Sequence, residues 1–133
     1  MRTNARETAF KILFSAQFNE EIEDTRRAVI NLEKLEENDV AYCNAILKSV
    51  IEHKIELTKV IDEHSRIFPE SRLFPADRSI LLIAIAEILY FDDIPSVVSA
   101  NEAANIASKY SSEKSATFIS GIISEIIREH DNV

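Results

Sequence analysis

The residues from 80 to 89 are apolar at every position except Glu87, and this run limits what the chain can fold into more than any other feature. A run of this length exceeds most buried strands and fits a helix that is covered by protein on all sides. The whole chain has 1 glycine and 3 prolines in 133 residues, so few positions interrupt a helix. We therefore predict an all-α fold with residues 80–89 in its central helix.

Apolar residues at helical spacing recur along the rest of the chain and, together with capping residues, predict about seven helices. The first helix is expected from a cap at Asn4 to about Asn19, and the second from a cap at Asp24 or Thr25 to about Leu35. A third begins from a cap at Asn38 or Asp39 and continues to Ile67, with or without a break near His53 or Glu56. After the central helix, a turn at 92–95 leads to a helix from Ser96 to Lys109, and the last helix follows 111–113.

The segment 68–75 is the clearest break between predicted helices, because it carries Pro69 and Pro75. We interpret residues 1–133 as a single domain with an N-terminal sub-bundle of about 1–68 and a C-terminal sub-bundle of about 69–133. Gly121 lies inside the last expected helix, where glycine costs up to about 1 kcal/mol relative to alanine. We expect another helix to approach closely there, so that Gly121→Leu would clash.

The composition indicates a cytoplasmic protein, and its charge limits where nucleic acid could bind. No apolar run reaches the roughly 18 residues of a membrane-spanning helix, and the single Cys43 excludes an internal disulfide. The net charge is −8, whereas proteins that bind nucleic acid alone are usually basic. Residues 1–18 carry a net charge of +2 and residues 19–39 one of −5. Phosphate contacts are therefore expected near the N-terminus, and the acidic remainder would suit a basic protein partner or simply keep the chain soluble.

The sequence contains no group of residues typical of an enzyme active site. It has no nucleophile elbow, no glycine-rich phosphate loop and no Cys-x-x-Cys pair, and its histidines are far apart in sequence. Asp62, Glu63 and His64 are neighbours, but adjacent helical residues point about 100° apart and do not readily share a metal. We predict no catalytic residue, no metal and no cofactor. Glu87 should be a buried acid with a partner, for which Arg72 or Arg78 are the candidates.

The first expected helix combines basic and aromatic side chains, which together are typical of single-stranded RNA recognition. Arg2, Arg6 and Lys11 alternate there with Phe10 and Phe14. We expect both arginines to be exposed. A second group of the same kind flanks the start of the last helix and comprises Lys109, Tyr110, Lys114 and Phe118.

Four blocks, in the right order, make the chain resemble the NusB family of transcription antitermination factors. The blocks, each with the family pattern that it resembles, are residues 5–14 (A-R-E-x-A-x-Q-x-L-Y), residues 77–88 (D-R-A-I-L-R-L-A-x-Y-E-L), residues 95–110 (P-x-x-V-x-I-N-E-A-V-E-L-A-K-K-Y) and residues 115–123 (S-x-x-F-V-N-G-V-L). The resemblance implies two helical halves and a role in antitermination of ribosomal RNA transcription. It also implies binding of single-stranded boxA-type RNA together with NusE, a small basic ribosomal protein, within the antitermination complex on RNA polymerase.

The resemblance also implies roles for particular residues. Those that it places at RNA contacts are Arg2, Arg6, Phe14, Tyr110 and Phe118, and those expected to meet the protein partner are Asp77 and Glu87. Lys11 stands where the family has glutamine and Lys114 where it often has an acid, and we expect both to contact RNA because of their charge. The chain departs from the family pattern at several polar positions, for example Leu82 for arginine and Ser120 for asparagine. These departures bear on RNA affinity more than on the fold.

Two other readings stay open. One is a NusB-like scaffold for protein interaction whose RNA binding is weakened. The other is an RNA-binding module related to the N-terminal part of ribosomal RNA cytosine methyltransferases, which would need its catalytic domain on another chain. The sequence leaves a homodimer open.

Overall fold

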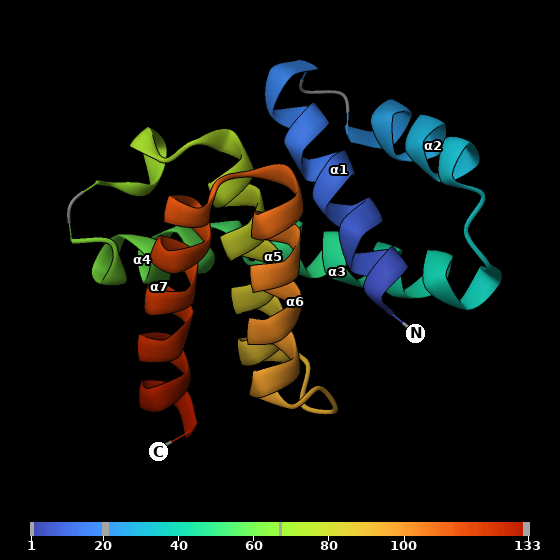
Figure 1. Ribbon diagram of the computed structural model, residues 1–133. Helices are drawn as coiled ribbons and strands as arrows, with labels where there is room; N and C mark the ends of the chain where they lie inside the picture. The colour runs from blue at the N-terminus through green and yellow to red at the C-terminus, as the bar shows by residue number, and fades with distance from the viewer. Residues whose placement is uncertain (1, 20–21, 67, 132–133) are drawn as a thin grey trace.

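The computed structural model describes residues 2–19, 22–66 and 68–131, which form α-helices and one short 3-10 helix (Figure 1). The elements are α1 (Thr3–Asn19), α2 (Ile22–Glu33), α3 (Glu37–Glu52), α4 (Lys54–His64), the 3-10 helix η1 (Glu70–Arg72), α5 (Pro75–Tyr90), α6 (Ser96–Tyr110) and α7 (Glu113–Asp131). The predicted all-α fold with seven helices is confirmed. None of the helices in the described ranges is long and apolar enough to cross a membrane.

Helix α5 occupies the centre, as the apolar run predicts. It begins with Pro75 at its first position, where the missing N–H costs nothing, and carries Asp77 in its first turn. Every residue from 79 to 88 is buried. Helices α1, α3, α4, α6 and α7 all pack against it. A single hydrophobic cluster therefore includes residues from both sides of the segment 68–75.

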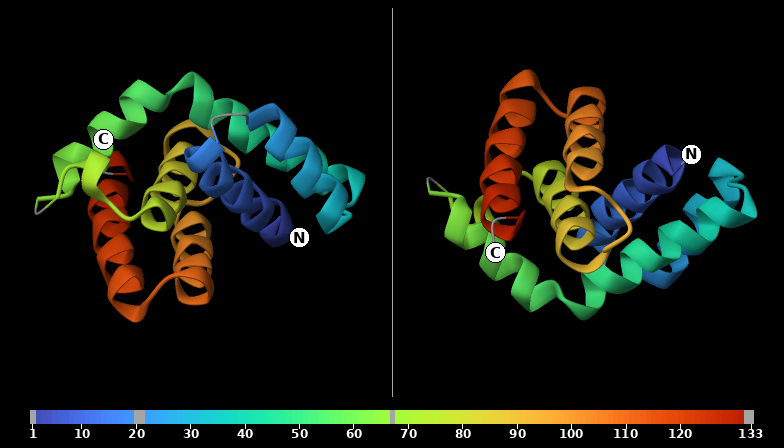
Figure 2. Two further views of the ribbon diagram at one scale, coloured as in Figure 1. Left: turned by 90° about the horizontal axis from the view of Figure 1, so that it is seen from above. Right: turned by 90° about the horizontal axis from the view of Figure 1, so that it is seen from below.

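Helices α3 and α4 form a bent pair that curves past α5 (Figure 2). The bend lies at His53, one of the two positions that the sequence indicated, where the backbone has φ −111° and ψ 20°. The His53 ring stacks on Tyr90 of α5 with 3.8 Å between ring centroids, and its Nδ1 donates to the Ser49 carbonyl at 2.9 Å. These contacts anchor the bend to the central helix.

Several helix starts differ from the predicted caps by one to three residues. Helix α2 begins at Ile22, α3 begins at Glu37 after Glu36, and Pro95 rather than Ser96 precedes α6. Helix ends depend on local turns that the apolar spacing does not fix. At the start of α7, by contrast, the backbone N–H of Ser115 donates to the Ser112 hydroxyl at 3.1 Å, a typical N-terminal cap.

The predicted close approach at Gly121 is wrong. A Cβ built at Gly121 meets no atom within 4 Å, and the residue is exposed on the outer face of α7. The buried stripe of α7 runs through Ile119, Ile122 and Ile123 instead, so Gly121 falls on the opposite side. Nothing in the structure requires glycine there.

We therefore predict that Gly121→Ala stabilises the protein. Alanine restricts the unfolded chain and favours the helix, and the expected gain in free energy of unfolding is about 0.5 to 1 kcal/mol. Urea denaturation of both proteins measures it, and Ser120→Ala, an exposed neighbour on the same helix, provides a control. A loss of stability would mean that the position is crowded after all.

Candidate nucleic-acid interface

Three aromatic rings meet where α1 passes the end of α6. Phe10 and Phe14 lie one turn apart on α1 with 5.9 Å between ring centroids, and the ring of Tyr110, the last residue of α6, lies 5.1 Å from that of Phe10. Phe10 is buried, whereas Phe14 and Tyr110 are each 36% exposed. One buried ring therefore supports two rings that remain accessible to a planar ligand.

Two lysines flank these rings. The Nζ atoms of Lys11 and Lys109 lie 6.0 and 5.4 Å from the centroid of the Tyr110 ring. We call Phe10, Lys11, Phe14, Lys109 and Tyr110 the aromatic–basic cluster. It combines faces for stacking bases with cations for phosphate, the two features that sequence-tolerant binding of single strands requires.

Carboxylates hold both lysines of the cluster. Glu7 accepts hydrogen bonds from Lys109 at 2.7 Å and from the Tyr110 hydroxyl, and Glu33 accepts one from Lys11 at 2.5 Å. Burial acts to raise the pKa of the Glu7 carboxyl, but the hydrogen bonds from Lys109 and Tyr110 outweigh it and hold this pKa below its ordinary value. A phosphate must therefore compete with ionised carboxylates for both cations.

A cleft of about 290 Å³ opens beside the aromatic–basic cluster, between α1, the residues that follow α2 and the end of α6. Its volume lies at the lower end of the range for ligand sites, which suits one nucleotide group rather than a large molecule. The lining residues are Asn4, Glu7, Thr8, Lys11, Glu33, Leu35, Lys109 and Tyr110.

A buried polar network fixes the N-terminal half of α1 against the centre of the protein. Arg6 Nε donates to both carboxylate oxygens of Glu87 on α5, at 2.9 and 2.8 Å, and the Tyr42 hydroxyl of α3 donates to the same carboxylate. Arg6 Nη1 also lies 3.6 Å from Glu102 Oε1 on α6. Arg6 and Glu87 are 3% and 1% exposed. The network thus joins four helices at one point.

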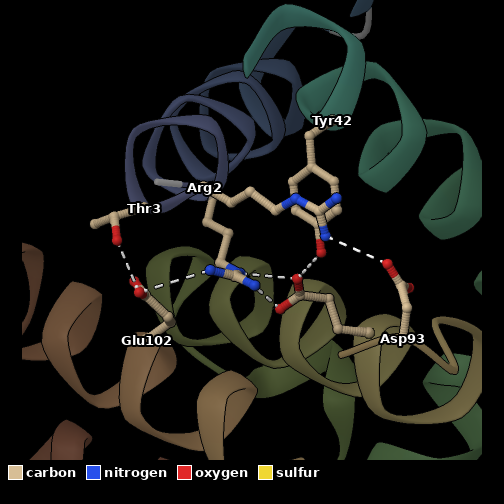
Figure 3. Close-up of polar contacts among 7 residues, drawn as sticks. Arg2, Thr3, Tyr42, Asp93 and Glu102 are labelled. Carbon is tan, nitrogen blue, oxygen red and sulfur yellow. Dashed lines mark hydrogen bonds and ion pairs between the residues drawn. The ribbon is translucent and has the colours of Figure 1, made fainter. Parts of the chain in front are cut away.

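Arg2 and Thr3 form the outer layer of this network (Figure 3). The Arg2 guanidinium lies over the Tyr42 ring, 4.3 Å from its centroid, and its Nη1 is 3.5 Å from Asp93 in the turn between α5 and α6. The Thr3 hydroxyl donates to Glu102 at 2.8 Å. The Arg2 side chain is 46% exposed, so a ligand can reach this guanidinium, which directly precedes α1.

Burial and charge act against each other in this network. Burial acts to lower the pKa of Arg6, but the charge and hydrogen bonds of Glu87, together with Tyr42 and Glu102, outweigh it and raise this pKa above its ordinary value. Burial first, and the hydrogen bond to Glu87 second, raise the pKa of Tyr42 well above its usual range. Both groups therefore keep their protons near neutral pH.

The prediction that Arg6 is exposed is wrong, and so are the predicted partners of Glu87. Glu87 pairs with Arg6 from the first helix, not with Arg72 or Arg78 from nearby sequence. Arg78 instead reaches the Glu70 carboxylate at 3.4 Å. Arg6 is thus a structural cation, since its side chain is enclosed by the helices that it joins.

The two acids predicted to meet a partner are both buried. Glu87 is engaged by Arg6, and Asp77 accepts hydrogen bonds from the hydroxyls of Ser111 and Ser115 at 3.0 and 2.9 Å. Asp77 is 3% exposed and ties the start of α5 to the turn between α6 and α7. Direct contact with a partner would require these bonds to open, and their role in binding stays a prediction.

The other predicted RNA residues lie on the first turns of α7. Lys114 is exposed, and Phe118 is half-buried against the core. The structure thus places Lys11, Phe14 and Tyr110 together, and Lys114 and Phe118 on the helix that follows Tyr110 after a short turn.

Several participants were not predicted to contact RNA or a partner, among them the acids Glu7, Glu33 and Glu102 and the buried Tyr42. For Tyr42 the residue type is itself a signal, because a tyrosine hydroxyl that becomes buried needs a hydrogen-bond partner. Glu7 and Glu102 have no local signal, since the lysine and the threonine they bind are about a hundred residues away along the chain.

These features define a class of protein. It is an all-α binding protein in which the first helix, locked to the central helix by a buried ion pair, presents aromatic rings and lysines at its junction with α6.

The comparisons with known proteins identify the family within this class. The model of the NusB family matches residues 3–128. The transcription antitermination protein NusB of Oceanobacillus iheyensis is 38% identical over 127 residues, covering 95% of this chain and 98% of that protein. NusB of Listeria monocytogenes serotype 4b is 36% identical over 128 residues, covering 96% and 97%. The chain belongs to the NusB family.

Solved structures share its fold. NusB of T. maritima superimposes with a TM-score of 0.91 at 27% identity, covering 98% of this chain and 92% of that one. A crystal structure of the antitermination factors NusB and NusE in complex with double-stranded RNA matches with a TM-score of 0.89 at 22% identity, covering 96% of both chains, which shows the fold alone.

The network generates a prediction about stability. Arg6→Met leaves the Glu87 carboxylate buried without its cation and should lower the free energy of unfolding by about 3 to 5 kcal/mol. Arg2→Met, the same change on the exposed arginine that precedes this helix, should cost less than about 1 kcal/mol. Urea denaturation measures both. Equal losses in the two variants would contradict the central role of the Arg6–Glu87 pair.

Proposed function

We propose that this chain is an antitermination factor that binds boxA-type RNA of ribosomal RNA transcripts together with NusE. The observation that carries the proposal is the exposure of Phe14 and Tyr110 beside Lys11 and Lys109. Proteins that recognise single-stranded RNA stack unpaired bases on aromatic rings and hold the phosphates with basic side chains. The aromatic–basic cluster supplies both at one place.

Family membership supports this function. The curated relatives are named transcription antitermination proteins, and in the solved complex of the same fold NusB is bound to NusE and RNA. Such a factor acts by assembling a complex on RNA polymerase, a role that asks for binding surfaces and not for catalysis. We accordingly place the protein in the cytoplasm and assign it no enzymatic activity.

The charge of the chain explains why a basic partner would be needed. The net charge is −8, and the two lysines of the aromatic–basic cluster are held by Glu7 and Glu33. Affinity for nucleic acid comes largely from phosphates neutralised by cations. A basic ribosomal protein supplies the cations that this surface lacks, while the rings orient the RNA.

We assign RNA contact to the accessible members of the predicted set and a supporting role to Arg6, which holds α1 in place. The accessible members are Arg2, Lys11, Phe14, Tyr110, Lys114 and Phe118.

A titration of fluorescently labelled boxA-type RNA tests the function. The protein is added alone and with NusE, each at a low and a high salt concentration. We expect weak binding alone, binding that tightens many-fold with NusE, and a loss of affinity as salt rises. Binding of NusE without any RNA binding would overturn the proposal.

Two variants test the assignment of the cluster. Phe14→Leu keeps an apolar side chain but removes the stacking face, which is worth about 1 to 3 kcal/mol per base, so the Kd for RNA should rise roughly tenfold. Lys11→Ala should reduce the slope of log K against log salt by about 1. Lys48→Ala on α3, where the lysine also pairs with a glutamate, is the matched control and should leave both quantities unchanged. An unchanged Kd in Phe14→Leu would remove that ring from the interface.

The pairing of lysines with carboxylates favours a second candidate, a scaffold for protein interaction with weakened RNA binding. Glu33→Gln distinguishes the two. It removes the carboxylate that holds Lys11, so RNA affinity should rise severalfold if the cluster is an RNA surface. If Glu33→Gln binds RNA no better than the parent and neither binds detectably with NusE, the scaffold is the correct reading.

A further inference from the structure

The end of α4 brings a histidine against two glutamates of α7. His64 is the last residue of α4, and Glu125 and Glu129 lie one turn apart on the face of α7 that meets it. One ligand atom from each residue lies within 4.8 Å of the other two. Helices α4 and α7 lie side by side here, at the side of the molecule away from α1 and α2 (Figure 1).

Hydrogen bonding fixes the orientation of the His64 ring. Its Nδ1 lies 2.7 Å from the Val60 carbonyl, which can only accept, so Nδ1 carries a hydrogen and donates it. The Nε2 atom then faces Glu129 Oε2 at 2.8 Å. The His64 side chain is only 7% exposed, so the ring is held where it is. A histidine with one nitrogen bound to a backbone carbonyl and the other free for a ligand is the usual arrangement at metal centres.

The short contact between His64 and Glu129 requires a cation. In the neutral ring with hydrogen on Nδ1, the Nε2 atom and the carboxylate are both acceptors and repel each other at 2.8 Å. At this distance a proton on Nε2 joins them in a direct hydrogen bond, and a metal ion can replace that proton. The proton satisfies Glu129 alone, whereas a metal also uses Glu125.

The third ligand is available at little cost. Glu125 Oε1 lies 3.2 Å from Arg66 Nη2, and the Arg66 side chain is 79% exposed. An exposed ion pair of this kind contributes little and can exchange for another partner. The Glu125 side chain itself is 29% exposed, so a hydrated ion can reach it.

The donor set selects the kind of metal. One imidazole nitrogen and two carboxylate oxygens suit Zn²⁺, which binds such atoms at about 2.0 to 2.2 Å, whereas Mg²⁺ and Ca²⁺ prefer oxygen alone. Tetrahedral ligands at this distance are separated by about 3.3 to 3.5 Å. The observed separations, from 2.8 Å to at most 4.8 Å, bracket this value, so small rotations of the two glutamates close the site.

We propose that His64, Glu125 and Glu129 bind one Zn²⁺ ion that joins the end of α4 to α7 and leaves a fourth position for water. The ion stabilises the folded protein, because its ligands come together only when the two helices are packed. This site is separate from the aromatic–basic cluster, whose residues lie on α1 and α6, and its two glutamates lie beyond the first turns of α7 that carry Lys114 and Phe118.

Calorimetric titration of the full chain with Zn²⁺ tests the proposal, with thermal melting as a second readout. The parent protein should bind one equivalent and melt at a higher temperature with Zn²⁺, but not with Mg²⁺ at the same concentration. Glu129→Gln, on a largely exposed side chain that leaves the fold intact, should weaken Zn²⁺ binding about tenfold or more, and His64→Ala should abolish the one-equivalent site.

His130→Ala is the matched control, because His130 is an exposed histidine on α7, the helix that carries Glu125 and Glu129. It should bind Zn²⁺ like the parent. The proposal is overturned if the parent binds no stoichiometric Zn²⁺, if Glu129→Gln and His64→Ala bind it as tightly as the parent, or if His130→Ala is the variant that loses it.

Discussion

The buried pair between Arg6 and Glu87 is the interaction on which the rest of the structure depends. A buried ion pair is not by itself a large source of stability, because removing two charges from water offsets most of their attraction. What it provides is position: a guanidinium with its Nε shared between two carboxylate oxygens fits in one orientation only. Helix α1 is therefore fixed in both rotation and register against α5.

The candidate interface follows from this placement. With Arg6 turned inward, the next turns of α1 bring Phe10 against Tyr110, and Phe14 and Lys11 come to the edge of the same surface. Tyr42 of α3 also donates to Glu87, so the same carboxylate holds α3 in place. The Arg2 guanidinium in turn lies over the Tyr42 ring. The residues that face solvent are thus positioned by residues that do not.

The electrostatics of the surface fit a subunit rather than an autonomous RNA-binding protein. Glu7 and Glu33 hold the two lysines in fixed places while cancelling much of their charge. Such pairs keep the surface ordered before RNA arrives, but they lower the affinity that the surface has alone. Joint binding with a basic partner reconciles an acidic chain with a nucleic-acid ligand.

The sequence predicted the helices well because their signals are local. The apolar run 80–89 identifies the central helix, and the bend at His53 lies at one of the two positions indicated. Contacts between distant residues have no such signal. Arg6 and Glu87 are 81 positions apart, so the partners expected for Glu87 were arginines nearby in sequence. His64 and Glu129 are 65 positions apart, and the same reasoning tested His64 only against its neighbours.

The face of Gly121 was a different failure. Glycine in a helix indicates either close packing or an unneeded cost, and only the neighbouring helices decide between them. The accessible cluster residues Lys11, Phe14 and Tyr110 were predicted from their chemistry and from resemblance to the family, whereas the burial of Arg6 needed the structure.

The measurement that tests this account most directly is the mapping of backbone amide NMR shifts while boxA-type RNA is added in the presence of NusE. We predict that the RNA-dependent shifts concentrate around residues 10–14 of α1, at the end of α6 and in the first turns of α7. Shifts that instead gather on the outer face of α2 and α3, with α1 and the end of α6 unaffected, would contradict the assignment of the aromatic–basic cluster to RNA.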